Sequence, residues 1–333
     1  MSAGVPLISV VVPALNEEDA IGKCLTALTA QTAPRDSYEI IVVDDGSTDR
    51  TRERAESFGV QVITQPNRGA GAARNLGAAN AHGDLVLFID GNCEAGPDWI
   101  QAMTAPFSDP NVAGVSGEKK TRQVGLWARF IQIEFDDRYD RISAHRWIDF
   151  VDSATAGYRR KLLLENGSFD VRLKEAEDAE LSFRMAERGY GLVLARNAIV
   201  YRRHPESLID YLRRKFQYAR WRVVVYARHP QKAASDSRTP QTQKVQAVLA
   251  LALLLTLAAA LVWNAAAWLF LSVALIFLAT TLRFAWRCWK TDPRIGLVAP
   301  VAVLLAAFSS GAGLVLGTLE QAATPRLKSK QPT

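Results

Sequence analysis

Residues 38–51, YEIIVVDDGSTDRT, join a run of apolar and β-branched residues to an acidic turn. A continuous apolar run of this length is typical of a strand that is covered on both faces of a sheet. Asp44, Asp45, Gly46 and Ser47 follow it directly, and Asp, Gly and Ser favour turns. The stretch therefore predicts a buried strand whose carboxyl end carries acidic side chains.

The same pattern repeats on both sides of this strand. Strands are predicted at residues 7–12, 38–43, 60–64 and 85–89, and helices at residues 17–30, 48–58 and 70–81. Strands that alternate with helices at short spacing predict an α/β fold, with a parallel sheet and helices on both faces. In such a sheet the ligand lies outside the carboxyl ends of the strands.

Polar side chains gather at three of the predicted strand ends. The first strand is followed by Pro13-Ala14-Leu15-Asn16-Glu17, the second by the acidic turn, and the fourth by Asp90-Gly91-Asn92. Each group alone is explained by helix capping and turn formation. Together, on one edge of a sheet, they favour a binding site.

The C-terminal part of the chain has a different composition. Residues 245–262 and 265–282 carry no charge and are long enough to cross a bilayer as helices. Residues 296–319 form another apolar stretch, which contains Pro300, Gly311 and Gly313 and is either a full crossing or partly re-entrant. Basic residues precede the first stretch and separate the second from the third. The positive-inside rule then predicts a multi-pass protein of the inner (plasma) membrane, with its N-terminal domain in the cytoplasm.

The formal net charge is +6, and much of the basic excess lies between Arg202 and Lys244, next to the first apolar stretch. This position predicts contact with anionic membrane lipids. Nucleic-acid binding is the competing explanation, but no nucleic-acid motif accompanies the basic residues, so no nucleic acid is expected as a partner. The 3 cysteines are widely spaced and form neither a disulfide framework nor a zinc pattern.

Five segments, in order, resemble the inverting family 2 glycosyltransferases, especially membrane-anchored ones of the exopolysaccharide type. They are VVPALNEE (11–18), VVDDGSTDRT (42–51), NRGAGAARNLG (67–77), LVLFIDGNC (85–93) and EDAELSFRMAERGY (177–190). The resemblance covers residues 5–230 and implies the GT-A fold, a Rossmann-like mixed sheet with helices on both faces. Together with the apolar stretches it predicts a catalytic domain at residues 1–204, an interfacial amphipathic helix and basic linker at 205–240, a membrane domain of about three helices at 241–322 and a tail at 323–333.

The resemblance also implies a donor, a nucleoside diphosphate sugar of the UDP or GDP type. It assigns donor nucleotide contacts to Pro13, Ala14, Glu17, Asp45, Arg74 and Asp90, with Asp45 binding the base. Asp90 and Asn92 occupy the family's Asp-x-Asp metal motif, and His204 matches a histidine found after the last strand, so these three are candidate ligands of Mg²⁺ or Mn²⁺. Asn92 departs from the usual Asp. An uncharged ligand predicts weaker metal binding or compensation by other ligands.

Glu177 and Asp178 match the segment that carries the catalytic base. Inversion requires a carboxylate to deprotonate the acceptor hydroxyl while it attacks the opposite face of the sugar. Asp178 is the predicted base, with Glu177 assisting it or binding the acceptor. The alternative explanation is that both acids only cap the N-terminus of a helix that runs to Arg188, where negative charge is favourable.

Residues 206–228 alternate apolar and basic residues with helical spacing, which predicts an interfacial amphipathic helix. Within it, Gln217, Arg220 and Trp221 match the Gln-x-x-Arg-Trp motif of processive polysaccharide synthases and are candidate contacts to the acceptor or the diphosphate. A membrane-surface helix with Trp221 as an interface anchor is the simpler alternative. Residues 127–147 lie where the family frames its acceptor.

These features predict an enzyme, a hexosyl or related transferase that acts on a lipid-linked or glycan acceptor at the cytoplasmic membrane face. A polyprenyl-phosphate sugar synthase, a processive polysaccharide synthase and a non-enzymatic nucleotide-binding membrane protein remain alternatives. A Rossmann-type oxidoreductase is excluded, because no Gly-x-Gly-x-x-Gly follows the first strand.

Overall fold

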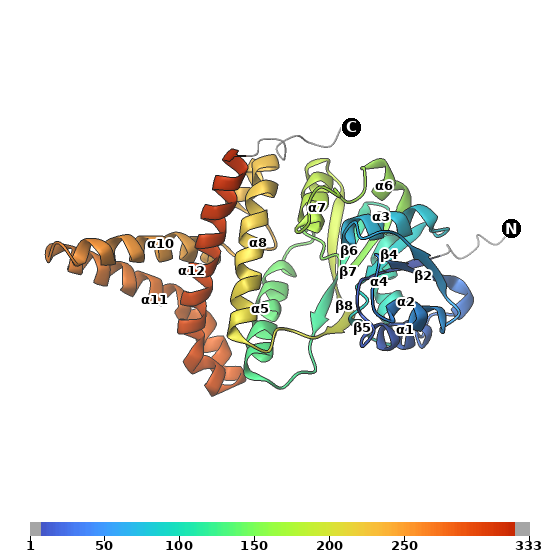
Figure 1. Cartoon of the computed structure of the whole chain (residues 1–333), viewed down its shortest axis with the longest axis horizontal. Helices are drawn as coiled ribbons and strands as arrows, with labels where there is room; N and C mark the ends of the chain where they lie inside the picture. Colours follow the sequence, from blue (N-terminus) through green and yellow to red (C-terminus); the bar gives the residue numbers. More distant parts are fainter. Residues whose placement is uncertain (1–7, 324–333) are drawn as a thin grey trace. The chain divides into compact units, whose positions relative to one another are not determined.

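The computed structural model describes residues 8–323 (Figure 1), and the chain divides into two compact units. The first unit contains the chain up to Arg122 and Tyr139–Arg203, and the second contains Gln123–Arg138 and the chain from His204 onward. Residues 123–138 lie within the predicted catalytic domain of residues 1–204 but group with the second unit. The predicted tail, residues 323–333, lies outside the described residues except for Ala323.

An eight-stranded mixed sheet, in the order β3-β2-β1-β4-β7-β6-β8-β5, forms the centre of the first unit. The neighbours β3, β2, β1 and β4 are parallel, β7 is antiparallel to β4 and β6, β8 is parallel to β6, and β5 is antiparallel to β8. The mixed sheet is confirmed, and the parallel order predicted from alternation holds for its first four strands. The strands are β1 (Ile8–Ala14), β2 (Tyr38–Asp44), β3 (Gln61–Thr64), β4 (Leu85–Ile89), β5 (Cys93–Ala95), β6 (Val112–Lys120), β7 (Thr155–Arg159) and β8 (Gly191–Arg202).

Two helices of the first unit begin later than their sequence spacing predicts, whereas α3 begins at Ala70 as predicted. Helix α1 begins at Ile21 rather than at residue 17, and α2 at Thr51 rather than at residue 48, because the residues after β1 and β2 bond to one another as loops. The helices of this unit are α1 (Ile21–Thr29), α2 (Thr51–Glu56), α3 (Ala70–Asn80), α4 (Trp99–Thr104), α6 (Arg160–Glu165) and α7 (Glu177–Glu187), with short 3₁₀ turns at Arg35–Ser37 and Ala105–Ser108.

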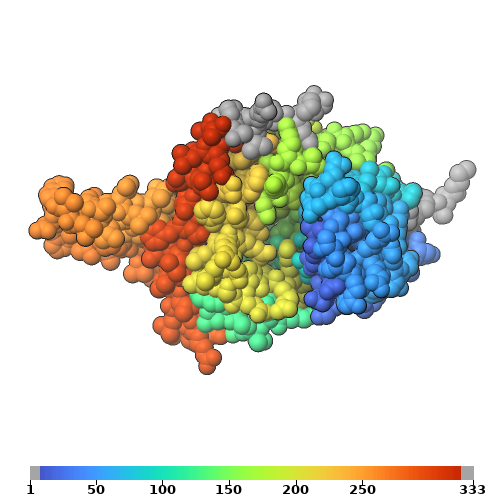
Figure 2. Space-filling view, in the orientation of Figure 1, coloured from blue at the N-terminus to red at the C-terminus, as the bar shows by residue number. Residues whose placement is uncertain are grey.

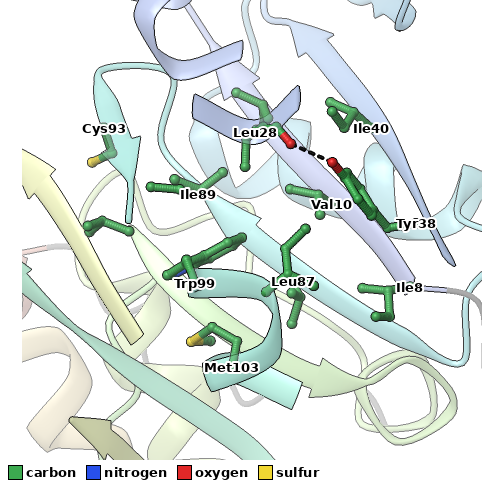
Figure 3. Packing of buried hydrophobic residues seen from close by; sticks show 14 of the residues in the cluster. Ile8, Val10, Leu28, Tyr38, Ile40, Leu87, Ile89, Cys93, Trp99 and Met103 are labelled. Atoms are coloured by element: carbon green, nitrogen blue, oxygen red, sulfur yellow. Dashed lines mark hydrogen bonds between the residues drawn. The ribbon is translucent and has the colours of Figure 1, made fainter. Parts of the chain in front are cut away.

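Strand β1 is buried along its whole length, because helices cover both faces of the sheet. Val10 and Val12 lie in one core cluster with Leu28 of α1 and Trp99 of α4. Figure 3 shows Val10, Leu28 and Trp99 in this cluster. Val11 is not in this cluster; it meets α3 at Gly77, where a Cβ would lie 2.3 Å from Val11 Cγ1. Only a residue without a side chain permits that approach, which brings α3 onto the sheet beside the strand ends.

The second unit is helical. It contains the first part of α5 (Leu126–Ile142), α8 (Leu208–Arg228), α9 (Pro230–Ala234), α10 (Gln241–Ala260), α11 (Ala265–Thr291) and α12 (Pro293–Ala323). Helices α10, α11 and α12 are long and apolar enough to cross a membrane, with mean hydropathies of 1.7, 2.2 and 2.0. Most of their residues are not buried within the protein, although α12 is more buried than the other two, and α10 and α11 form a hairpin (Figure 1).

Helix α12 is continuous through Pro300, so the partly re-entrant alternative for this stretch is not found. The connection from α11 to α12 is also shorter than predicted. The basic residues at 283–290, which the sequence places between the second and third apolar stretches, extend α11, and only Asp292 separates the two helices. The Asp292 carboxylate accepts a hydrogen bond from the Arg294 N–H at 2.9 Å, and Pro293 occupies the first position of α12, an arrangement that favours a helix start.

Helix α8 begins where the sequence predicts, with Ser207 as its N-cap. One face of it packs tightly along α12 (Figure 2). Cβ atoms at Gly313 and Gly317 would lie 2.3 Å and 2.4 Å from the carbonyl oxygens of Phe216 and Arg220. Two small residues four positions apart therefore let the two backbones touch, as in close helix pairs of membrane proteins.

Candidate active site

The loops after β1 and β2 are joined into one platform. The Asp45 N–H donates to the Ala14 carbonyl at 2.9 Å, the Asn16 N–H to Ser47 Oγ at 3.0 Å, and the Thr48 N–H to Asn16 Oδ1 at 2.9 Å. Asn16 adopts a left-handed backbone conformation with φ of 53°. Pro13 and Ala14 are the buried last residues of β1. Their carbonyl groups accept hydrogen bonds from the neighbouring loops.

Asp45 is buried and organises the turn that leads into α3. Its Oδ1 accepts hydrogen bonds from Gln65 Nε2 at 2.6 Å and the Arg68 N–H at 2.8 Å, and its Oδ2 accepts one from the Gly69 N–H at 2.8 Å. Gly69 has φ of 93°, a conformation that favours glycine. The predicted base-binding residue thus also shapes the Gly-rich turn from which α3 and Arg74 extend.

Arg74 joins the sheet edge to the predicted catalytic acids. Its Nη2 lies 2.8 Å from Asp90 Oδ1, and its Nη1 lies 2.7 Å from Glu177 Oε1. All three come from separate elements: α3, the end of β4 and the start of α7. The Arg74 side chain is only 4% exposed. Buried ion pairs of this kind fix side-chain positions, because any other arrangement leaves a charge without a partner.

Glu177 and Asp178 open α7 and are both buried. Ala176, the residue before them, has φ of 65°, and this left-handed turn sets the direction in which α7 begins. Asp178 Oδ1 accepts a hydrogen bond from the Ala179 N–H at 2.7 Å, as a carboxylate at a helix start does. Burial raises the pKa of Glu177 to about 7, against the opposing attraction of Arg74.

Asp90 has a second cationic partner that the sequence did not single out. Arg202, at the end of β8, places Nη1 3.1 Å from Asp90 Oδ2. Burial works to raise the pKa of Asp90, but Arg74 and Arg202 outweigh it and hold that pKa below its usual range. The only sequence signal was the position of Arg202, two residues before His204 at the end of a predicted strand.

Asn92 is bonded to Glu17 of the first loop. Its Nδ2 donates to Glu17 Oε1 at 2.6 Å. Burial raises the pKa of Glu17 despite this hydrogen bond. An Asp at position 92 would set two carboxylates at this distance, whereas the Asn amide supplies the donor that Glu17 needs. The structure thus gives the departure from Asp-x-Asp a local physical reason.

Among residues 8–323, no three His, Cys, Asp or Glu side chains are grouped so that they could hold a metal ion by themselves. Asp90 and Asn92 nevertheless offer two oxygen ligands on one turn. Mg²⁺ is commonly held by one or two carboxylates together with substrate phosphates and water. The residues present therefore fit a cation that arrives with a diphosphate better than a cation bound by the protein alone.

The remaining predicted site residues lie in the second unit. His204 is buried, stacks on Phe135 with ring centroids 5.2 Å apart, and has Nε2 3.0 Å from Gln132 Oε1. Arg220 makes a bidentate ion pair with Glu320 of α12, with both N–O distances at 2.7 Å. Gln217 is exposed and Trp221 is half-buried on the same helix.

The family model for glycosyl transferase family 2 matches residues 9–167. The chain is similar to the glycosyltransferase AglE of Haloferax volcanii, with 28% identity over 240 residues, 68% of this chain and 76% of the relative. It is also similar to the pre-mycofactocin glycosyltransferase of Mycobacterium tuberculosis, with 28% identity over 238 residues, 68% of this chain but only 49% of the relative. The solved mannosyltransferase PcManGT of Pyrobaculum calidifontis shares the fold, with a TM-score of 0.60, 21% identity and coverage of 93% of this chain and 88% of that one.

Proposed function

The chain belongs to glycosyl transferase family 2, and from this premise we propose that it moves a sugar from a nucleoside diphosphate to a lipid-linked or glycan acceptor at the cytoplasmic membrane face. The ion-paired group Asp90–Arg74–Glu177, with Asp178 beside it, carries the proposal. It brings the strand end that would face the diphosphate next to the acids that would face the acceptor.

Asp178 acts as the general base in this proposal. Its carboxylate takes the proton of the acceptor hydroxyl as that oxygen attacks the anomeric carbon, and the bond from that carbon to the diphosphate oxygen breaks on the opposite face. Glu177 is the second candidate, because a carboxyl group with a pKa of about 7 is well matched to proton transfer near neutral pH. The ion pair between Glu177 and Arg74 instead favours a role in which Glu177 fixes the position of the neighbouring side chains.

The donor is proposed to lie against the platform made by Pro13, Ala14, Glu17 and Asp45, with Asp45 setting affinity for the base. Asp90 and Asn92 would hold Mg²⁺ or Mn²⁺ in this proposal. The role of His204 as a further ligand stays a prediction from the sequence. A bound divalent cation neutralises charge on the departing diphosphate. The Pyrobaculum mannosyltransferase was solved in complex with GDP-Man and Mn²⁺, which supports GDP sugars and Mn²⁺ as first probes.

The acceptor is proposed to meet α8 at the membrane surface, through Gln217, Arg220 and Trp221. The Gln-x-x-Arg-Trp match favours a processive synthase as the second candidate function. The pairing of Arg220 with Glu320 ties that motif to α12, which also suits a fixed acceptor site for a single transfer. A polyprenyl-phosphate acceptor is the third candidate, since a lipid phosphate needs no general base.

A donor screen tests the proposal. Detergent-solubilised protein is incubated with labelled UDP and GDP sugars, Mg²⁺ or Mn²⁺, and membrane lipid extract, and both hydrolysis and transfer are measured. The proposal predicts transfer from at least one donor and its loss in Asp178→Asn. Equal transfer by Asp178→Asn would favour a lipid phosphate acceptor, and long products would favour the processive synthase. If no donor is consumed, the proposed function is wrong.

A further inference from the structure

Asp90, the only charged residue of the predicted metal motif, is clamped by two arginines. Arg74 Nη2 lies 2.8 Å from its Oδ1, and Arg202 Nη1 lies 3.1 Å from its Oδ2. Each carboxylate oxygen thus already faces a guanidinium. A divalent cation that approaches this carboxylate alone must overcome the repulsion of two positive charges within a few ångströms.

The two arginines that pair with Asp90 differ in how exposed they are. The Arg74 side chain is 4% exposed and also bonds to Glu177, so it is fixed from two sides. The Arg202 side chain is 21% exposed. Its backbone pairs with Cys93, three residues after Asp90, so the guanidinium reaches the turn from a rigid strand end. Arg202 is therefore the more exposed of the two arginines and the one with more access to a ligand in solvent.

The charges around the clamp also disfavour a diphosphate that arrives alone. Asp90, Glu177 and Asp178 carry three carboxylates close to Arg74, and all three influence its ionisation. A nucleoside diphosphate adds further negative charge. An arginine is well suited to such an anion, because its planar group donates two parallel hydrogen bonds to phosphate oxygens.

From this geometry we propose that Arg202 couples donor and metal binding. In the empty enzyme it pairs with Asp90 and weakens metal binding; when the donor binds, it turns to the diphosphate and leaves Asp90 Oδ2 to the cation. This inference rests on the proposed function. It requires that donor and metal strengthen each other's binding by the same factor, as thermodynamic linkage demands.

The test measures Mn²⁺ binding to full-length, detergent-solubilised protein by the paramagnetic resonance signal of free Mn²⁺. Titrations are made without nucleotide and with saturating GDP or UDP. The variants are Arg202→Gln and, as a matched control, Arg196→Gln, which removes an arginine of the same strand that pairs with Glu118 and Asp140 instead. Asp90→Asn identifies the Mn²⁺ bound at this turn.

In the unmodified protein we expect the nucleotide to tighten Mn²⁺ binding about tenfold or more, within the usual range for linked sites. Arg202→Gln should bind Mn²⁺ more tightly than the unmodified protein when nucleotide is absent, and should lose most of the nucleotide's effect. Arg196→Gln should behave as the unmodified protein does. Structural damage would weaken metal binding, so a gain in affinity separates the proposed role from misfolding.

Unchanged or weaker Mn²⁺ binding by Arg202→Gln without nucleotide would overturn the inference. So would equal Mn²⁺ affinity with and without nucleotide in the unmodified protein. If either result is found while the unmodified protein still transfers sugar from a nucleotide donor, the inference fails and the proposed function stands. If it neither binds GDP or UDP nor consumes a donor, both fail together.

Discussion

Replacing Arg74 with Gln removes the cation that holds two buried carboxylates in place. Arg74 is 3% exposed and bonds to both Asp90 and Glu177. After the change Asp90 keeps Arg202, but the only cation that the structure pairs with Glu177 among the described residues is gone. The variant therefore tests whether this ion-paired group stabilises the domain as well as the site.

The expected cost follows from these contacts. Breaking a buried pair by removing one partner costs about 3–5 kcal/mol, because it leaves an uncompensated charge. Since Asp90 retains one arginine and Glu177 can take up a proton, we expect the lower end, about 3 kcal/mol. For a domain of roughly 150–250 residues this corresponds to a fall in Tm of about 6–12 °C.

Thermal unfolding of the metal-free, full-length protein in detergent measures this effect. Arg52→Gln is the control, because its ion pair with Glu56 is exposed and such pairs contribute about 0–1 kcal/mol. The double variant Arg74→Gln, Glu177→Gln removes both charges and should recover about 1–2 kcal/mol of the loss, while nucleotide binding stays impaired. Strictly additive effects of the two substitutions would show that the pair is not coupled and would refute the reasoning.

Three further predictions concern packing, pH and donor binding. Gly317→Ala should lower Tm, because its Cβ would lie 2.4 Å from a backbone oxygen of α8, whereas Gly311→Ala, with 3.5 Å to its nearest atom, should not. Burial raises the pKa of Glu177 to about 7. The protonated form therefore stabilises the fold fully below about pH 4.5, and this stabilisation is lost as the pH rises through 7. Glu177→Gln should abolish this pH-dependent loss of stability, about 3 kcal/mol, in a plot of Tm against pH. Asp45→Asn replaces one carboxylate oxygen by an NH₂ group, which would then face a backbone N–H instead of accepting its hydrogen bond. Calorimetry should therefore show about tenfold weaker nucleotide binding, with a smaller change in kcat.

The sheet edge could be predicted because its signals are local. Apolar β-branched runs end in Pro, Asp and Gly at fixed places, and the carboxyl ends of parallel strands must meet. The loops around Asn16 and Ser47 therefore lie together as expected. These local signals do not indicate which N–H groups donate hydrogen bonds to each carboxylate. Asp45 bonds to the turn before α3, and that contact depends on backbone conformation rather than on residue type.

Contacts between distant segments were harder to predict. Arg202 reaches Asp90 across 112 positions of sequence, and nothing in a single sequence marks two such residues as partners. Glu320 could have been suspected, because an acid at the end of an apolar helix is costly unless it is paired. Phe130 of the segment 123–138 packs with Tyr211 and Ile295, although its mixture of aromatic and charged residues suits a soluble domain equally well.

The most direct test of the central claim compares donor binding with sugar transfer in Asp178→Asn. Calorimetry gives the affinity for the donor that the screen identifies, and a single-turnover experiment gives the rate of transfer to the acceptor. Loss of a general base costs roughly 10²–10⁴-fold in rate. We therefore predict unchanged donor affinity and at least about a hundredfold slower transfer. Transfer at the unmodified rate would contradict the assignment of Asp178 as the base.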